Sequence, residues 1–186
     1  MLIRNRFQVA AGAFVLGMAF AGYCAAGLPD SGEEARVQTH GIAPSSIMAE
    51  HKELHEALGK VIASGGRTAA EGRNVERLLQ PHFAKEERFA LPPLVVLPDL
   101  ASGRVPPNAV EIARMATVLQ DDMPAMLAEH RAIGQALDRL HTAALDERKP
   151  QAAAFVAHLK AHAKQEEEIF YPAAILAGRY LKLQRR

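Results

Sequence analysis

In four stretches of the chain, apolar residues recur every three or four positions. This spacing gathers them on one face of an α-helix, with polar residues on the opposite face. The pattern predicts helices over about 46–63, 68–89, 109–143 and 150–171. Because each helix has an apolar face to bury, we predict an all-α fold, an antiparallel four-helix bundle.

Glycine and proline mark the expected helix ends. Gly65-Gly66 ends the first helix, Pro92-Pro93 the second and Pro172 the fourth, after which a short tail helix can reach Leu183. Thr68 and Glu71 have the spacing of a capping box at the start of the second helix.

Two further prolines and an apolar loop refine this outline. Pro124 should kink or split the third helix. The segment 91–108 is rich in proline but contains Leu94-Val95-Val96-Leu97, which is too apolar for a free linker. We therefore expect it to cross one end of the bundle.

The N-terminus has a different pattern. Arg4 and Arg6 precede a stretch without charge from Val9 to Leu28, and small residues before Gly27 offer a cleavage point. Residues 1–26 are thus predicted to be a signal peptide or, alternatively, a membrane anchor of about 20 residues. Residues 27–45 lack periodicity and are predicted to be a linker to a bundle over 46–186.

The N-terminal segment predicts the cellular location of the bundle. The bundle is expected to be exported and to work in the periplasm or extracellular space, or to be membrane-anchored with the domain outside the cytoplasm. Contact with a membrane is expected only if the N-terminal segment is retained.

Charge and cysteine content exclude some functions. The formal net charge is +1, which gives no basic surface for nucleic acid. The single cysteine, Cys24, falls in the predicted targeting segment. A processed domain would have neither a disulfide nor a thiolate metal site, so any metal must be held by nitrogen and oxygen.

The chain contains an internal repeat. Ala49-Glu50-His51 recurs as Ala128-Glu129-His130, and the segment His82 to Glu87 recurs as His162 to Glu167. Each second motif has the form His-x3-Glu-Glu, and a proline follows ten residues after its histidine. Two helix pairs with matching polar residues predict a pseudo-twofold arrangement.

These polar residues fall on the apolar stripes. His82 and Glu86 are four positions apart and share one helix face, as do His162 and Glu166. A carboxylate buried among apolar side chains costs several kcal/mol unless it is compensated. Two carboxylates and four imidazoles converging from four helices would hold two cations, and this donor set suits iron or manganese.

At this point the sequence resembles the hemerythrin-like cation-binding family over about residues 46–172. The resemblance implies that His51, His82, His130 and His162 are terminal ligands of two non-haem iron ions. It implies that Glu86 and Glu166 bridge these ions, together with an oxo or hydroxo group. A ferritin-like site is disfavoured, because it needs Glu-x-x-His and no histidine here has a glutamate three positions before it.

A proline, two further histidines and two further glutamates near the implied ligands differ from the family pattern or add to it. Pro81 precedes His82 and removes a helical hydrogen bond. Oxygen carriers of this family have a fifth histidine, for which His55 and His158 are candidates, either as metal ligands or as hydrogen-bonding supports of the ligands. Glu87 and Glu167 are expected at the surface or around the ligands.

Three functions remain open at this stage. The first is reversible binding or sensing of a small diatomic ligand, O2 or NO, at a di-iron site outside the cytoplasm. The second is a di-iron redox enzyme of ferroxidase, peroxidase, NO-reducing or iron-centre repair type, as suggested by the family resemblance. The third is a metal-free helical module that binds a partner protein. A monomer or a small homo-oligomer is expected.

Overall fold

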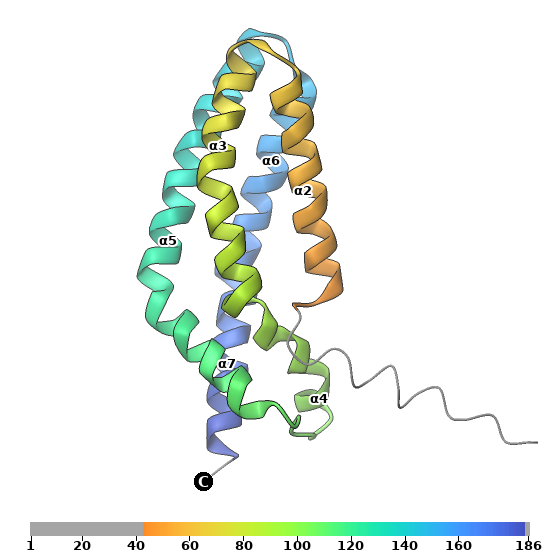
Figure 1. Ribbon diagram of the computed structural model, residues 1–186, viewed down its shortest axis with the longest axis vertical. Helices are drawn as coiled ribbons and strands as arrows, with labels where there is room; N and C mark the ends of the chain where they lie inside the picture. Colours follow the sequence, from red (N-terminus) through yellow and green to blue (C-terminus); the bar gives the residue numbers. More distant parts are fainter. Residues whose placement is uncertain (1–42, 185–186) are drawn as a thin grey trace, which may run out of the picture.

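A computed structural model describes residues 43–184, and within this range every regular element is helical and no strand occurs. The predicted targeting segment and most of the predicted linker lie outside the described residues. The bundle consists of α2 (Ser45–Ala63), α3 (Gly66–Lys85), α5 (Ala109–Asp146) and α6 (Pro150–Gln165) (Figure 1). No helix within the described residues is long and apolar enough to cross a membrane.

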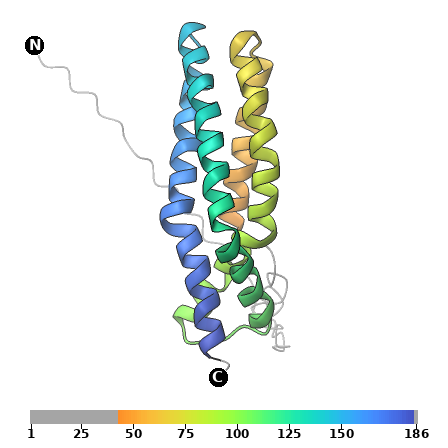
Figure 2. The ribbon, with the colours of Figure 1, turned by 90° about the vertical axis from the view of Figure 1, so that its left-hand side faces the viewer.

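The four helices form a closed ring. In sequence order each helix packs on the next, and α2 also packs on α6 (Figure 2). Because short turns join α2 to α3 and α5 to α6, the helices of each pair run in opposite directions. The predicted four-helix architecture is therefore confirmed.

Two of the helices end in wide π turns. η1 (Glu86–Ala90) extends α3, and η3 (Glu166–Phe170) joins α6 to α7 (Tyr171–Leu183). Each π turn is closed by an N–H five residues after its first carbonyl, from Leu91 to Glu86 and from Tyr171 to Glu166. The two predicted halves thus share this uncommon feature at the same motif position.

The prediction that Pro172 ends the fourth helix is wrong. The helical path continues through η3 into α7, and Pro172 lies in the first turn of α7. A proline is tolerated there because its missing N–H would have no helical partner. The π turn resets the hydrogen-bond pattern directly before it. In the other half, Pro92 instead opens η2 (Pro92–Val96).

The apolar loop crosses one end of the bundle, as predicted. η2 packs against α5 and α7, and the short α4 (Leu97–Ala101) follows it. Leu91, Leu94 and Val96 are buried there. The long α5 remains a single helix with Pro124 inside it, and its axis bends in the lower part of Figure 1. Pro124 therefore does not split the helix, and a proline inside a helix is a common cause of such a bend.

The start of α3 differs from the predicted capping box. The helix begins at Gly66, and Thr68 makes no bond to Glu71. Instead Glu147, which follows α5, accepts bonds from the N–H groups of Arg67 (2.6 Å) and Thr68 (3.1 Å) and from the Thr68 hydroxyl (2.7 Å). A carboxylate that is distant in the sequence thus accepts the hydrogen bonds of the free N–H groups at the start of α3, which the predicted capping box was expected to accept.

Among the residues that the structure describes, two of the three apolar clusters of the core lie on either side of a polar layer. One layer contains Leu54, Leu79 and Leu137, and the other contains Leu91, Met126 and Tyr171. Seven polar or charged residues are buried within the described range. Six of them are the proposed ligands: His51, His82, Glu86, His130, His162 and Glu166.

Candidate metal centre

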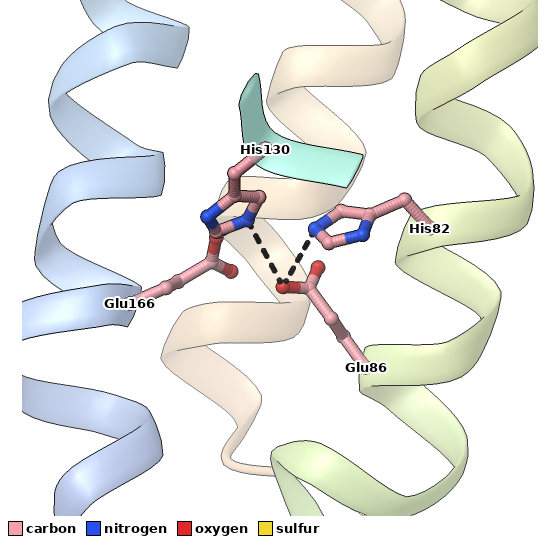
Figure 3. Close-up of side chains that lie close together, drawn as sticks. All are labelled: His82, Glu86, His130 and Glu166. Carbon is pink, nitrogen blue, oxygen red and sulfur yellow. Dashed lines mark ion pairs between the residues drawn. The ribbon is translucent and has the colours of Figure 1, made fainter. Parts of the chain in front are cut away.

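The six buried polar residues meet at the centre of the bundle. His51 comes from α2, His130 from α5, and each His-x3-Glu pair from one helix and the π turn that follows it. Figure 3 shows four of these side chains pointing toward one another, with His82 and His130 both facing Glu86. The carboxylate and imidazole atoms fall into two groups that could each hold a cation.

The first group combines two imidazoles with one oxygen from each carboxylate. Glu86 Oε1 lies 3.3 Å from His82 Nε2 and 4.0 Å from His130 Nε2. Glu166 Oε2 lies 3.5 Å from His130 Nε2. Donor atoms bound about 2.1 Å from one ion are themselves about 3–4 Å apart, so this spacing fits a metal site.

The second group consists of His51, His162 and Glu166. Glu166 Oε1 lies 3.0 Å from His162 Nε2 and 3.6 Å from His51 Nε2. Glu86 Oε2 lies 3.7 Å from His51 Nε2. Glu166 therefore turns one oxygen toward each donor group, the arrangement required of a carboxylate that bridges two ions. Glu86 belongs to the first group, and its second oxygen faces His51 of the other pair.

Helical geometry explains why these side chains converge. Residues four apart on a helix lie one above the other, which brings His82 beside Glu86 and His162 beside Glu166. Pro81 does not displace its neighbour, because α3 continues through it and the His82 side chain is 1% exposed. Both π turns begin at the glutamates, and such turns are frequent at functional sites.

Four more glutamates surround the histidines on their outer side. The contacts join His51 Nδ1 to Glu87 (3.0 Å), His82 Nδ1 to Glu129 (2.8 Å), His130 Nδ1 to Glu167 (2.7 Å) and His162 Nδ1 to Glu50 (3.2 Å). The first three are hydrogen bonds, and the fourth is an ion-pair contact without hydrogen-bond alignment. Each glutamate approaches the histidine of a neighbouring helix, and the four contacts run in one sense around the bundle.

This outer ring prepares the imidazoles to bind a metal. A carboxylate at Nδ1 holds the ring proton there, which leaves the Nε2 lone pair facing inward. Within residues 43–184, Nε2 of His51, His82 and His162 has no hydrogen-bond partner, nor do Glu86 Oε2 and Glu166 Oε1. Buried polar atoms require partners, and metal ions would satisfy all five.

Sequence reasoning found half of this ring. Glu87 and Glu167 were expected at the surface or around the ligands, and the structure places both at histidine Nδ1 atoms. Glu50 and Glu129 received no role. Their signal was present in the repeated Ala-Glu-His motif, but a residue adjacent to a buried histidine faces a neighbouring helix, and only the packing identifies that helix.

Tyr171 is the other residue that the sequence analysis missed. Its fully buried hydroxyl donates a hydrogen bond to Glu86 Oε1 and lies 3.3 Å from His130 Nε2. The equivalent position in the first half, five residues after Glu86, is the buried Leu91. The two halves of the site therefore differ, with a phenol beside the first group of donors only.

Burial and mutual charge control ionisation here. Burial lowers the pKa of His82, but Glu86 and Glu129 more than offset this and raise it to about 9. Burial and the charge of Glu166 raise the pKa of Glu86. Burial also opposes ionisation of Glu166, yet the nearby imidazoles of His130, His162 and His51 hold its pKa well below the usual range.

The same factors act on the phenol. Burial first, and then the charges of Glu86 and Glu166, raise the pKa of Tyr171 far above its ordinary value. Tyr171 is therefore a neutral hydrogen-bond donor at this site.

The two further candidate histidines lie outside the cluster. His55 is exposed and sets its ring edge-on to Phe83, with ring centroids 5.2 Å apart. His158 is 51% exposed, and its Nε2 lies 3.4 Å from Glu50 Oε1. Neither belongs to the two donor groups, although His158 touches the glutamate that contacts His162.

The fold and the site define a class: a four-helix protein with a buried cation-binding cluster of imidazoles and carboxylates. The family model of the hemerythrin HHE cation binding domain matches residues 43–174. The chain therefore belongs to this family, as the sequence resemblance implied. Searches of the curated proteins and of the solved structures found no match to the chain.

Proposed function

We propose that the chain holds two non-haem iron ions and uses them to bind or sense O2 or NO outside the cytoplasm. His51, His82, His130 and His162 would be terminal ligands, and Glu86 and Glu166 would bridge the ions. The observation that carries this proposal is that Glu166 presents one oxygen to each of the two donor groups, while Glu86 presents one oxygen to the first group and the other to His51.

The donor count leaves room for a ligand. Two octahedral ions need about twelve positions, of which four imidazoles and two bridging carboxylates supply about eight. A bridging oxo or hydroxo group would supply about two more. The apolar layers on both sides of the site would limit the access of water. When bound, the iron pair would supply the electrons and the coordination positions for the diatomic ligand.

The chain's own residues would orient the centre. The outer glutamates hold the imidazole protons at Nδ1, and the Tyr171 hydroxyl donates a hydrogen bond next to the first donor group.

Location outside the cytoplasm rests on the N-terminal sequence alone. N-terminal sequencing of protein from its native cells should give Gly27 after cleavage; a start at Met1 would favour an anchor.

One observation favours the second candidate, a di-iron redox enzyme. His55 and His158 lie outside the donor groups, so within the described residues no fifth histidine fills a coordination position. A site with more open positions suits turnover, such as ferroxidase, peroxidase or NO-reducing chemistry. Stopped-flow mixing of the reduced protein with O2 separates the two. A visible absorption band that disappears on removal of O2 supports reversible binding, whereas rapid irreversible oxidation supports the enzyme.

The iron assignment itself is tested by metal analysis. Glu86→Gln and Glu166→Gln keep the side-chain shape but remove the bridging charge, so each variant should retain fewer iron ions than the wild type. Glu53→Gln changes an exposed glutamate of α2 and should retain the full content. Full iron retention in both buried variants would refute their assignment. A wild type without iron, and with unchanged helicity after chelation, would favour the metal-free interaction module.

A further inference from the structure

The two histidines that start the repeated motifs are covered differently. In the first half, the Phe83 ring stacks on the His51 ring, with centroids 3.9 Å apart and planes 5° from parallel. His55 in turn packs edge-on against Phe83, which is 2% exposed. The aromatic pair closes the approach to His51 between α2 and α3.

The second half lacks both covering rings. The repeat aligns Phe83 with Ala163 and His55 with Gly134. At this place a cleft of about 270 Å³ opens between α5 and α6, lined by Gly134, Ala163 and Ile133 and reaching His130. A side chain at Gly134 would point into open space, because a Cβ built there meets no atom within 4 Å.

The cleft ends at the cluster. His130 both lines the cleft and belongs to the first donor group. His130 is 7% exposed, whereas His51, His82 and His162 are each 1% exposed. The only partly accessible ligand candidate among the four is therefore the one at the cleft.

Each lysine at the opening is paired with a carboxylate. Lys160 and Lys164 line it, but Lys160 Nζ lies 2.5 Å from Asp138 and Lys164 Nζ lies 3.7 Å from Glu168. A third carboxylate, Glu167, is bound to His130. Two cationic and three anionic side chains give the opening no positive field to attract an anion, so it favours an uncharged ligand that crosses it without electrostatic steering.

We propose that the cleft between α5 and α6 is the entrance through which an uncharged diatomic ligand reaches the centre. This inference rests on the proposed function, O2 or NO binding at the cluster. The size is sufficient, because a diatomic gas is similar to a water molecule, whose share of liquid volume is about 30 Å³. Because Phe83 and His55 close the equivalent approach to His51, we expect ligand entry only from the side of His130.

The test is to plug the cleft. Gly134→Leu places a side chain into the open space, and Ala163→Phe restores the ring found at Phe83. Gly59→Leu is the control, because Gly59 is an exposed helical glycine outside the cleft, and its added Cβ, like that of Gly134, meets no atom within 4 Å. The association rate of NO with the reduced, iron-loaded protein is measured by stopped flow, together with iron content and equilibrium Kd.

Both plugged variants should retain full iron and an unchanged Kd while the association rate falls by about tenfold or more. The dissociation rate should fall in the same proportion, because a barrier on the path slows both directions equally. The control should stay within about twofold of the wild type, and added salt should leave the wild-type rate unchanged.

Each outcome has one meaning. Wild-type rates in both plugged variants, at full iron content, would overturn the entrance. A lower affinity with an unchanged association rate would also overturn it, since that result indicates a disturbed site. An iron-loaded wild type that binds neither NO nor O2 would instead refute the proposed function.

Discussion

The outer glutamates should control metal affinity, and Glu129 offers the sharpest test. Its Oε2 accepts a hydrogen bond from His82 Nδ1 at 2.8 Å, and its Oε1 accepts one from Lys85 at 2.5 Å. Glu129→Gln keeps the shape of the side chain but removes the charge that holds the His82 proton at Nδ1. The Nε2 lone pair then becomes a weaker and less well-oriented donor.

The structure allows the size of this effect to be estimated. A hydrogen bond to a charged group contributes about 1.5–3 kcal/mol, and loss of such an outer partner weakens metal binding by about 10–100-fold. The Glu129 side chain is 33% exposed, so solvent screens part of its charge and the lower half of the range applies. We expect Glu129→Gln to raise the Kd for ferrous iron by about 10–30-fold, or about 1.4–2 kcal/mol.

Glu50 supplies a matched comparison in the other half. Its Oε1 lies 3.2 Å from His162 Nδ1 without hydrogen-bond alignment, so Glu50→Gln should change the Kd by only about threefold. Both values are measured by anaerobic competition with a chromophoric chelator. Equal effects of the two variants, or an unchanged Kd in Glu129→Gln, would show that hydrogen-bond geometry at Nδ1 does not set the affinity.

Three other predictions concern stability. Tyr171→Phe removes the donor to a buried carboxylate and should lower the free energy of unfolding by about 1–3 kcal/mol in urea titrations; a loss under about 0.5 kcal/mol would contradict the role of the hydroxyl. Gly178→Ala brings its new Cβ into contact with Ala116 where α7 packs on α5, and should lower the free energy of unfolding by about 1–3 kcal/mol in thermal unfolding. Gly59→Ala has open space around the new Cβ and should raise the free energy of unfolding by about 0.5–1 kcal/mol. Hydrogen bonds from Lys149 and Thr68 lower the pKa of Glu147 to about 2. The ionised Glu147 therefore stabilises the fold fully above about pH 4.5, and this contribution is lost as the pH falls toward 2. Glu147→Gln should remove this part of the dependence of stability on acid, and identical acid-unfolding profiles of variant and wild type would disprove the role of Glu147.

Local sequence rules succeeded where one helix alone decides the outcome. The helical period located all four helices, and the four-residue spacing of His82 and Glu86 placed both on a buried face. The same reasoning failed at Pro172, because a π turn moves the hydrogen-bond pattern by one residue. It also failed at the start of α3, where Glu147 from another helix replaces the expected local cap.

The outer ring and the cleft needed the packed structure. Glu129 follows the same repeat as Glu50, yet only Glu129 forms an aligned hydrogen bond to its histidine, a difference that arises between helices and is absent from the repeated motif. The sequence likewise displays Gly134 and Ala163 without showing that they face each other. Two small residues make a cleft only when two helices bring them together.

By itself, the sequence determined the helices, the repeat and the six buried donor residues, because each follows from periodicity along one chain segment. The tertiary structure decided which oxygen faces which imidazole, which glutamate orients each histidine, that Tyr171 bonds to Glu86, and which side of the centre is open. These features depend on distances between residues from different helices, and helix packing alone fixes such distances.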